Sequence, residues 1–97
     1  MEVIIKRSTK NDKKFDAIVD GKKTISFGAA GMSDFTKHKD PERKERYINR
    51  HKKKESWNNP KTAVFYAKNV LWNKPTMQAS VSDINKKFPK LKVKLKL

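Results

Sequence analysis

Residues 14–27 read KFDAIVDGKKTISF, and this stretch decides the fold. On either side of Asp20-Gly21, apolar side chains alternate with polar ones, which is the pattern of strands that bury one face. Glycine adopts positive φ without steric cost, so Asp-Gly between two such segments is a strong hairpin signal. The stretch therefore predicts two antiparallel strands, over residues 14–19 and 23–27.

Two segments outside the hairpin have strand patterns of their own. Residues 2–7 read EVIIKR and precede a looser connection, so we expect a third strand that completes an antiparallel three-stranded meander. Residues 91–97 read LKVKLKL, in which apolar residues and Lys alternate as in a half-buried strand. We expect this C-terminal strand to join the sheet.

A basic surface helix is expected after an irregular segment. Residues 28–31 read GAAG, which lacks the full phosphate-binding glycine patterns and is expected to be a strand-ending turn and not an anion-binding nest. Asp40-Pro41-Glu42 is a favourable helix start, because Asp can cap, Pro loses no hydrogen bond at the first position and Glu suits the helix dipole. This helix should extend to about Lys54.

Two further helices are expected in the second half of the chain. Asn59-Pro60 repeats the cap-and-proline signal and introduces a segment up to residue 72 that is apolar almost all round, which is typical of a central core helix. Ser80 or Ser82 could cap a short third helix that ends at Phe88. The prediction is one α+β domain over residues 1–97, with an N-terminal antiparallel three-stranded meander, two to three helices and a C-terminal strand in the sheet.

Charge is the strongest signal in the composition. The 97 residues include 25 Lys plus Arg and 10 Asp plus Glu, for a net charge of +15. Residues 61–97 carry nine basic side chains and one acidic side chain. Such a protein is attracted to phosphate backbones or anionic surfaces, with an affinity that falls as salt rises. The plainer interpretation, that the lysines keep the protein soluble, stays open.

The composition also excludes several kinds of site and segment. The chain has no cysteine, so neither disulfides nor thiolate metal sites are expected, and nothing argues for an oxidising compartment. The N-terminus lacks the apolar core of a signal peptide, and no segment approaches the roughly 18 apolar residues of a membrane span. We therefore expect an intracellular protein with no membrane partner.

The first basic helix is one candidate contact with nucleic acid. Most of its cations fall on one stripe by helical spacing, and Arg grips phosphate through a planar fork. The helix candidates are Arg43, Arg46, Arg50, Lys52, Lys53 and Lys54. A solvated face with ordinary pairs such as Glu42 with Arg46 is the plainer interpretation.

The C-terminal strand is the second candidate contact. Alternation places its lysines on one face about 6.7 Å apart, close to the repeat of phosphates along a nucleic-acid strand. The strand candidates are Lys90, Lys92, Lys94 and Lys96. The same row could equally protect an edge strand from pairing with another strand, and the two roles are compatible.

Aromatic and histidine side chains are weaker candidates. Trp57 lies in a polar loop, where it could stack on a base, whereas Trp72 ends the apolar helix and is expected in the core. His38 and His51, with acidic residues nearby, are the only set that could cut phosphodiesters, but no metal-ligand motif accompanies them. His51 is expected to pack beside Tyr47 or to pair with an acid. We therefore expect no enzyme, no metal and no cofactor.

The segments just described, taken together, are similar to a known family. They are FGAAGMSDFT (27–36), HKDPERK (38–44), YI (47–48), RH (50–51), ESW (55–57), LWNKPT (71–76) and AS (79–80). Their combination resembles a family of small basic proteins of unknown function encoded by large double-stranded DNA viruses of algae and amoebae. The resemblance implies a viral setting, in which such a protein could package the genome or cement the capsid, and a shaped loop over residues 27–40.

One function and two alternatives follow. We expect a viral-type protein that binds nucleic acid, DNA rather than RNA, through phosphates and without sequence specificity. The first alternative is a virion structural protein, a minor capsid or cement component, that binds acidic surfaces of capsid proteins; the second is a small metal-dependent nuclease. The expected location is inside the host cell, with packaging in the virion as an option. An edge strand at either terminus offers a route to a homodimer.

Overall fold

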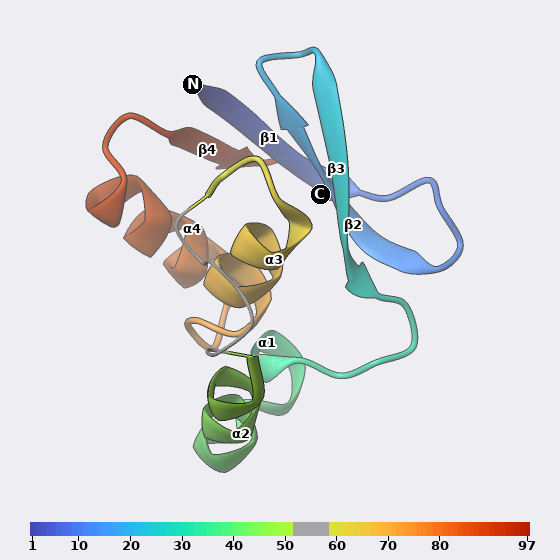
Figure 1. Cartoon of the computed structure of the whole chain (residues 1–97), viewed down its shortest axis with the longest axis vertical. Helices are drawn as coiled ribbons and strands as arrows, with labels where there is room; N and C mark the ends of the chain where they lie inside the picture. The colour runs from blue at the N-terminus through green and yellow to red at the C-terminus, as the bar shows by residue number, and fades with distance from the viewer. Residues whose placement is uncertain (52–58) are drawn as a thin grey trace.

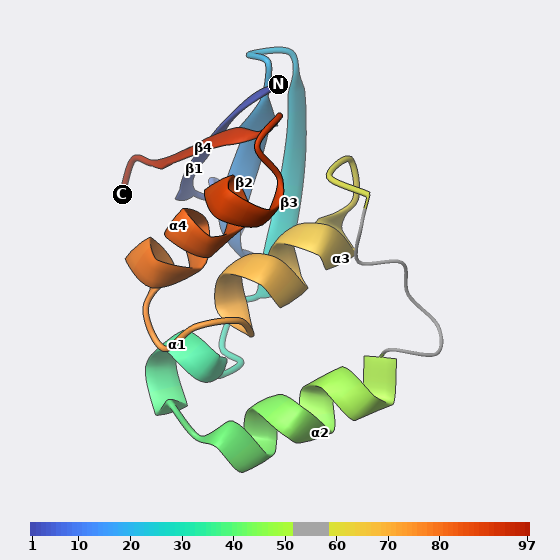
Figure 2. The ribbon, with the colours of Figure 1, turned by 90° about the vertical axis from the view of Figure 1, so that its left-hand side faces the viewer.

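The computed structural model describes residues 1–51 and 59–97, and in it four strands form one sheet in the order β3-β2-β1-β4 (Figure 1). The strands are β1 (Glu2–Arg7), β2 (Lys13–Val19), β3 (Lys23–Ala29) and β4 (Lys92–Leu95). The helices are α1 (Phe35–His38), α2 (Pro41–His51), α3 (Ala63–Tyr66), the π-helix η1 (Ala67–Leu71) and α4 (Met77–Lys87). They gather on one side of the sheet (Figure 2). The predicted α+β fold is confirmed.

The first three strands form the predicted antiparallel meander. Ile5 of β1 lies opposite Ala17 of β2, which lies opposite Ile25 of β3, and all three are buried. Asp20 and Gly21 have φ angles of 52° and 66°, as a type I′ turn requires. The hairpin prediction is confirmed.

The C-terminal strand β4 lies beside β1 and runs parallel to it, with Val93 opposite Val3. β1 is therefore an interior strand, and the prediction of a free sheet edge at the N-terminus is wrong. The outer edge of β4 is partly occupied by Asn85. The Asn85 side-chain oxygen accepts from the Val93 N–H at 2.8 Å, and its amide nitrogen donates to the Val93 carbonyl at 3.0 Å.

The core lies between the inner face of the sheet and the helices α3, η1 and α4. Phe65 and Tyr66 are fully buried, and the Tyr66 ring centre lies 5.7 Å from that of Phe27. Ile84 of α4 adds to the same cluster. Within residues 1–51 and 59–97, no helix has the length and apolar character that a membrane crossing needs.

Two helices begin at threonines and not where the sequence predicted. α3 begins after Thr62, which caps it, and Asn59-Pro60 belongs to the turn before it. α4 begins after Thr76, whose hydroxyl caps its first turn. The predicted cap at Ser80 is wrong because its hydroxyl is turned back and accepts from the Lys74 N–H at 3.0 Å.

The predicted core helix is two elements, since α3 continues into the π-helix η1. A π-helix pairs each N–H with the carbonyl five residues back, so a carbonyl at the junction loses its ordinary partner. Where α3 passes into η1, the Asn69 side-chain amide donates to the Phe65 carbonyl at 2.9 Å. Hydrophobic periodicity does not distinguish such a segment from an α-helix.

Gly28, near the end of β3, lies against Leu71 of η1. Its φ is +77°, and a Cβ at this position would lie 2.8 Å from Leu71 Cδ1. After β3 the chain turns as predicted, with the Met32 N–H donating to the Ala29 carbonyl at 3.2 Å. A side chain at position 28 would therefore strain the backbone and require the Leu71 side chain to shift.

We expect Gly28→Ala to lower the free energy of unfolding by about 2–5 kcal/mol, from roughly 1–2 kcal/mol of backbone strain and roughly 1–3 kcal/mol of overpacking. Gly31→Ala is the matched control, because Gly31 has a φ of +83° and nothing among the described residues lies within 4 Å of the added Cβ. Its loss should be about 1–2 kcal/mol. Urea unfolding measures both, and equal losses would show that Leu71 moves aside freely.

Tyr66 carries a buried polar group. Its side chain is fully buried, and its hydroxyl has no hydrogen-bond partner in the described part of the chain. Burial raises the pKa of Tyr66 to about 12, and the charge of Asp20 acts in the same direction. The folded protein therefore favours the neutral phenol. The neutral phenol contributes fully to the free energy of unfolding below about pH 10, which is the pKa of Tyr in the unfolded chain. This contribution is lost as pH rises toward 12.

We expect Tyr66→Phe to raise the free energy of unfolding by about 1 kcal/mol at pH 7, because it removes a buried hydroxyl without a partner. The advantage of the variant should grow above pH 10, where the wild type loses the contribution of its neutral phenol. Urea unfolding of both proteins at pH 7 and pH 11 measures the difference. If the variant is less stable than the wild type at pH 7, the Tyr66 hydroxyl must have a stabilising hydrogen-bond partner, and the prediction is wrong.

Candidate anion-binding surfaces

The helix α2 begins where the sequence predicted and is held to the body by few contacts. Pro41 is its first residue, and the Asp40 carboxylate accepts from the Glu42 N–H at 3.0 Å. None of its described residues is buried. The Tyr47 ring instead stacks on Trp72, with ring centres 4.4 Å apart and planes 2° from parallel. This stack determines which side of α2 faces the body.

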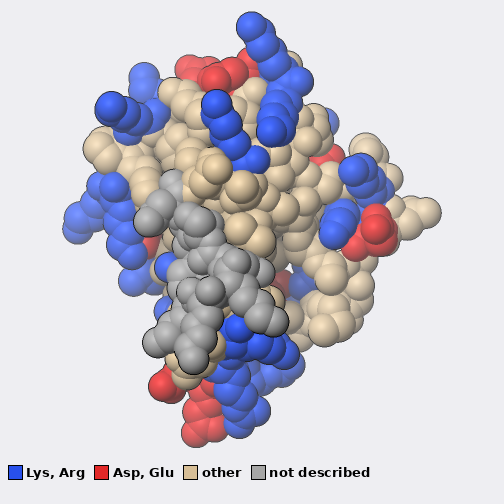
Figure 3. All heavy atoms as spheres, in the orientation of Figure 1, with Lys and Arg blue, Asp and Glu red and all other residues tan. Residues whose placement is uncertain are grey.

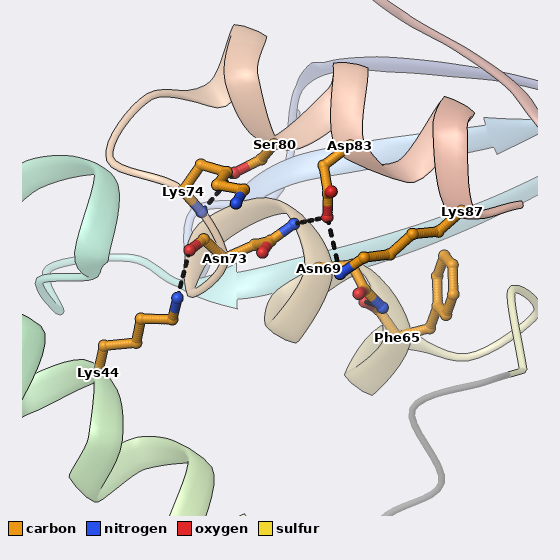
Figure 4. Close-up of polar contacts among 8 residues, drawn as sticks. All are labelled: Lys44, Phe65, Asn69, Asn73, Lys74, Ser80, Asp83 and Lys87. Atoms are coloured by element: carbon orange, nitrogen blue, oxygen red, sulfur yellow. Dashed lines mark hydrogen bonds and ion pairs between the residues drawn. The ribbon is translucent and has the colours of Figure 1, made fainter.

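A second, polar attachment joins α2 to α4 (Figure 4). Lys44 Nζ donates to the Asn73 carbonyl at 2.6 Å and lies 5.1 Å from the centre of the Phe35 ring. The Asn73 side-chain amide donates to Asp83 at 2.7 Å, and Lys87 Nζ lies 3.1 Å from the same Asp83 oxygen. The contacts form a continuous connection from α2 to α4.

This junction holds more positive than negative charge. Burial lowers the pKa of the Lys44 ammonium, and repulsion from Lys74 and Lys87 lowers it further. Burial and repulsion from Lys87 and Lys44 likewise lower the pKa of Lys68. The hydrogen bond from the Asn73 side chain, and then Lys87, hold the pKa of Asp83 below its ordinary value. Among the described residues, Asp83 is the carboxylate whose charge opposes this repulsion at both Lys44 and Lys68.

Three exposed arginines of α2 line an open hollow of about 310 Å³, which we call the arginine hollow. Its lining residues are Arg43, Arg46, Arg50, Met32, Ser33 and Trp72. The arginines share one stripe of the helix, as their spacing predicted. Arg46 lies 3.8 Å from Glu42, and because both side chains are exposed this attraction is weak. Neither of the other two arginines forms an ion pair within the described residues.

One wall of the arginine hollow is the loop before α1, and Asp34 fixes it. The buried Asp34 carboxylate accepts from Lys14 Nζ at 2.6 Å and from the Thr36 N–H at 2.9 Å, and the Thr36 hydroxyl also donates to it. Asp34 thereby caps α1, a helical turn where the sequence predicted irregular structure. These hydrogen bonds give the loop a defined conformation, as the resemblance implied for residues 27–40.

β4 and the residues on either side of it carry the second set of cations. Lys92, Lys94 and Lys96, which we call the lysine row, line a hollow of about 270 Å³ together with Glu2, Val3 and Ile4. In the described part of the chain none of the three forms an ion pair. Lys90 is exposed in the preceding loop, where its carbonyl accepts from the N-terminal ammonium at 2.9 Å.

The two sets of cations form separate surfaces. No residue lines both the arginine hollow and the hollow of the lysine row. In Figures 1 and 2, α2 lies at one end of the molecule and β4 toward the other. On the face drawn in Figure 3, Lys and Arg atoms gather in separate groups around the rim, one of them over α2.

Four of the predicted contact residues lie outside the described residues: Lys52, Lys53, Lys54 and Trp57. Trp72 was expected in the core, but it is half-buried and lines the arginine hollow as well as packing on the core. Sequence reasoning missed Met32 and Ser33, because nothing in a loop sequence shows which helix will lie against it. Met32 is 63% exposed.

Both histidines belong to the aromatic group around Trp72. The His38 ring centre lies 5.3 Å from that of Trp72, and the His51 ring centre lies 4.5 Å from that of Tyr47. The predicted packing of His51 beside Tyr47 is confirmed. In residues 1–51 and 59–97, no group of three or more His, Cys, Asp or Glu side chains could hold a metal ion. The absence of enzymatic activity stays a prediction.

We expect Trp72→Ala to release α2 from the body, because the ring stack and its buried area hold a helix that has no buried residue of its own. Amide hydrogen exchange in residues 41–51 should accelerate more than exchange in β1–β3. Phe88→Ala is the control, since Phe88 packs on Phe65 in the core, with ring centres 5.3 Å apart. The idea fails if both variants accelerate exchange in α2 by the same factor.

Comparison with known proteins relates the N-terminal half to a family. The Family of unknown function (DUF5754) matches residues 3–51, which include β1–β3, α1, α2 and the three arginines. No curated protein and no solved structure matches the chain. The family description states neither an activity nor a source, so the viral setting stays a prediction. Since the match covers half of the chain, the protein belongs to this family of unknown function, DUF5754.

Proposed function

We propose that the protein binds nucleic acid through its phosphates, without sequence specificity, and that the arginine hollow is the main contact. The observation that carries the proposal is the stripe of three exposed arginines around one hollow. Guanidinium groups bind phosphate oxygens with two parallel hydrogen bonds, so a stripe of them suits a phosphate backbone. The net charge of +15 adds long-range attraction toward any polyanion.

The surroundings of the arginines support contact with phosphates rather than bases. Base stacking needs an aromatic ring with a free face. None of the aromatic side chains in the described part of the chain is exposed, and Trp72 is stacked on Tyr47. Double-stranded DNA, whose bases are already stacked, is therefore the proposed ligand. The choice of DNA over RNA rests on the DNA-virus setting that the sequence resemblance implies.

We expect the triple variant R43A/R46A/R50A to bind duplex DNA roughly tenfold more weakly at near-physiological salt, a loss of about 1.4 kcal/mol. The slope of log K against log salt should become shallower by about 2–3, since each lost phosphate contact removes about 0.9. Fluorescence anisotropy of a labelled duplex at several salt concentrations measures both. K22A/K23A/K61A is the matched control, because it removes the same charge from exposed lysines that line neither hollow.

Three results would count against the proposal. One is a control variant that loses as much affinity and slope as the arginine variant, which would mean that net charge alone drives binding. Another is wild-type affinity that does not change with salt. The third is competition by polyglutamate as strong as that by unlabelled DNA of unrelated sequence, which would indicate an acidic protein surface as the partner.

A further inference from the structure

The lysine row forms a second cationic surface on the sheet. Val93 is buried, whereas its neighbours Lys92 and Lys94 are exposed, so the row faces away from the core. Successive lysines of a strand face lie about 6.7 Å apart. Glu2, opposite Lys92 in the register, is the acidic residue of this hollow. The three lysines therefore leave a local excess of positive charge.

Asn85 restricts what the lysine row can bind. Its side chain satisfies both the N–H and the carbonyl of Val93 at the outer edge of β4, at 2.8 and 3.0 Å. Another strand would have to displace Asn85 in order to pair there. A second copy would also bring two lysine rows together, which is the repulsion that protects sheet edges. A polyanion suits this surface better than an added strand does.

The lysine row and the arginine hollow are far apart on the molecule. α2 and β4 lie toward opposite ends of a molecule whose longest extent is 35 Å (Figures 1 and 2). Interactions between exposed charges are screened over about 8 Å at physiological ionic strength. A polyanion on one surface therefore leaves most of the attraction of the other surface in place.

We propose that one molecule bridges two nucleic-acid duplexes, with the arginine hollow on one and the lysine row on the other. The proposal rests on the proposed function, because it assigns the phosphates of a second duplex to the second surface. Bridging by this route needs no dimer, since one chain carries both surfaces. It assigns the protein a role in holding DNA segments together and not only in coating them.

A capture experiment tests the bridge. Beads that carry a biotinylated duplex are incubated with the protein and a second, fluorescent duplex that has no biotin, and the retained fluorescence is measured. The wild type should retain label, with less at large protein excess because each duplex is then coated separately. K92Q/K94Q/K96Q should retain about tenfold less label, while anisotropy still detects its binding to a single duplex. R43A/R46A/R50A should also lose capture.

The capture experiment has one control variant and one substitute for the triple lysine variant. K22A/K23A/K61A removes the same number of charges elsewhere and should capture the second duplex far better than the lysine-row variant does. If circular dichroism or light scattering shows that K92Q/K94Q/K96Q unfolds or aggregates, Lys94→Glu alone tests the same surface, and it should also lower the retained label.

The outcomes separate the bridge from the proposed function. A lysine-row variant that captures as much label as the wild type overturns the bridge and leaves the proposed function intact. Wild-type protein that binds one duplex in anisotropy but captures no second duplex has the same meaning. Wild-type protein that binds no duplex in anisotropy overturns both.

Discussion

Burial of one face of the sheet is the constraint on which the other features depend. Phe65, Tyr66 and Ile84 from the helices pack against Val3 and Phe27 of the strands. A chain that is only 35% hydrophobic has few apolar side chains left once that layer is filled. The outer face of β4 and the helix α2 are therefore built from polar and charged residues, which makes them available for contact with a polyanion.

Local chemistry explains which parts of the fold the sequence could predict. The Asp20-Gly21 turn and the alternation around it depend on neighbouring residues, so the meander was predictable. The caps at Thr62 and Thr76 were not, because several hydroxyl and amide residues compete near each helix start and packing decides among them. The π-helix was not predictable either, since its apolar residues follow the same periodicity as those of an α-helix.

The candidate surfaces, too, were predictable only in those features that depend on local sequence. Helical spacing alone placed Arg43, Arg46 and Arg50 on one stripe, and strand alternation alone placed the lysine row on one face. The walls of the arginine hollow come from Met32 in the loop before α1 and from Trp72 after η1, and only the tertiary structure shows that both lie against α2. The separation of the two surfaces likewise belongs to the tertiary structure, since no residue lines both hollows.

The pairing of β4 with β1 joins two strands that are far apart in the sequence. Glu2 and Lys92 are neighbours in the sheet although they lie 90 positions apart in the sequence, so the second edge of β1 is filled only by a distant segment. Contacts this distant in sequence close last because they carry the largest loop entropy. Until then, the apolar run from Val3 to Ile5 has one open side. β4 therefore closes the sheet by covering the edge of β1 that faces away from β2.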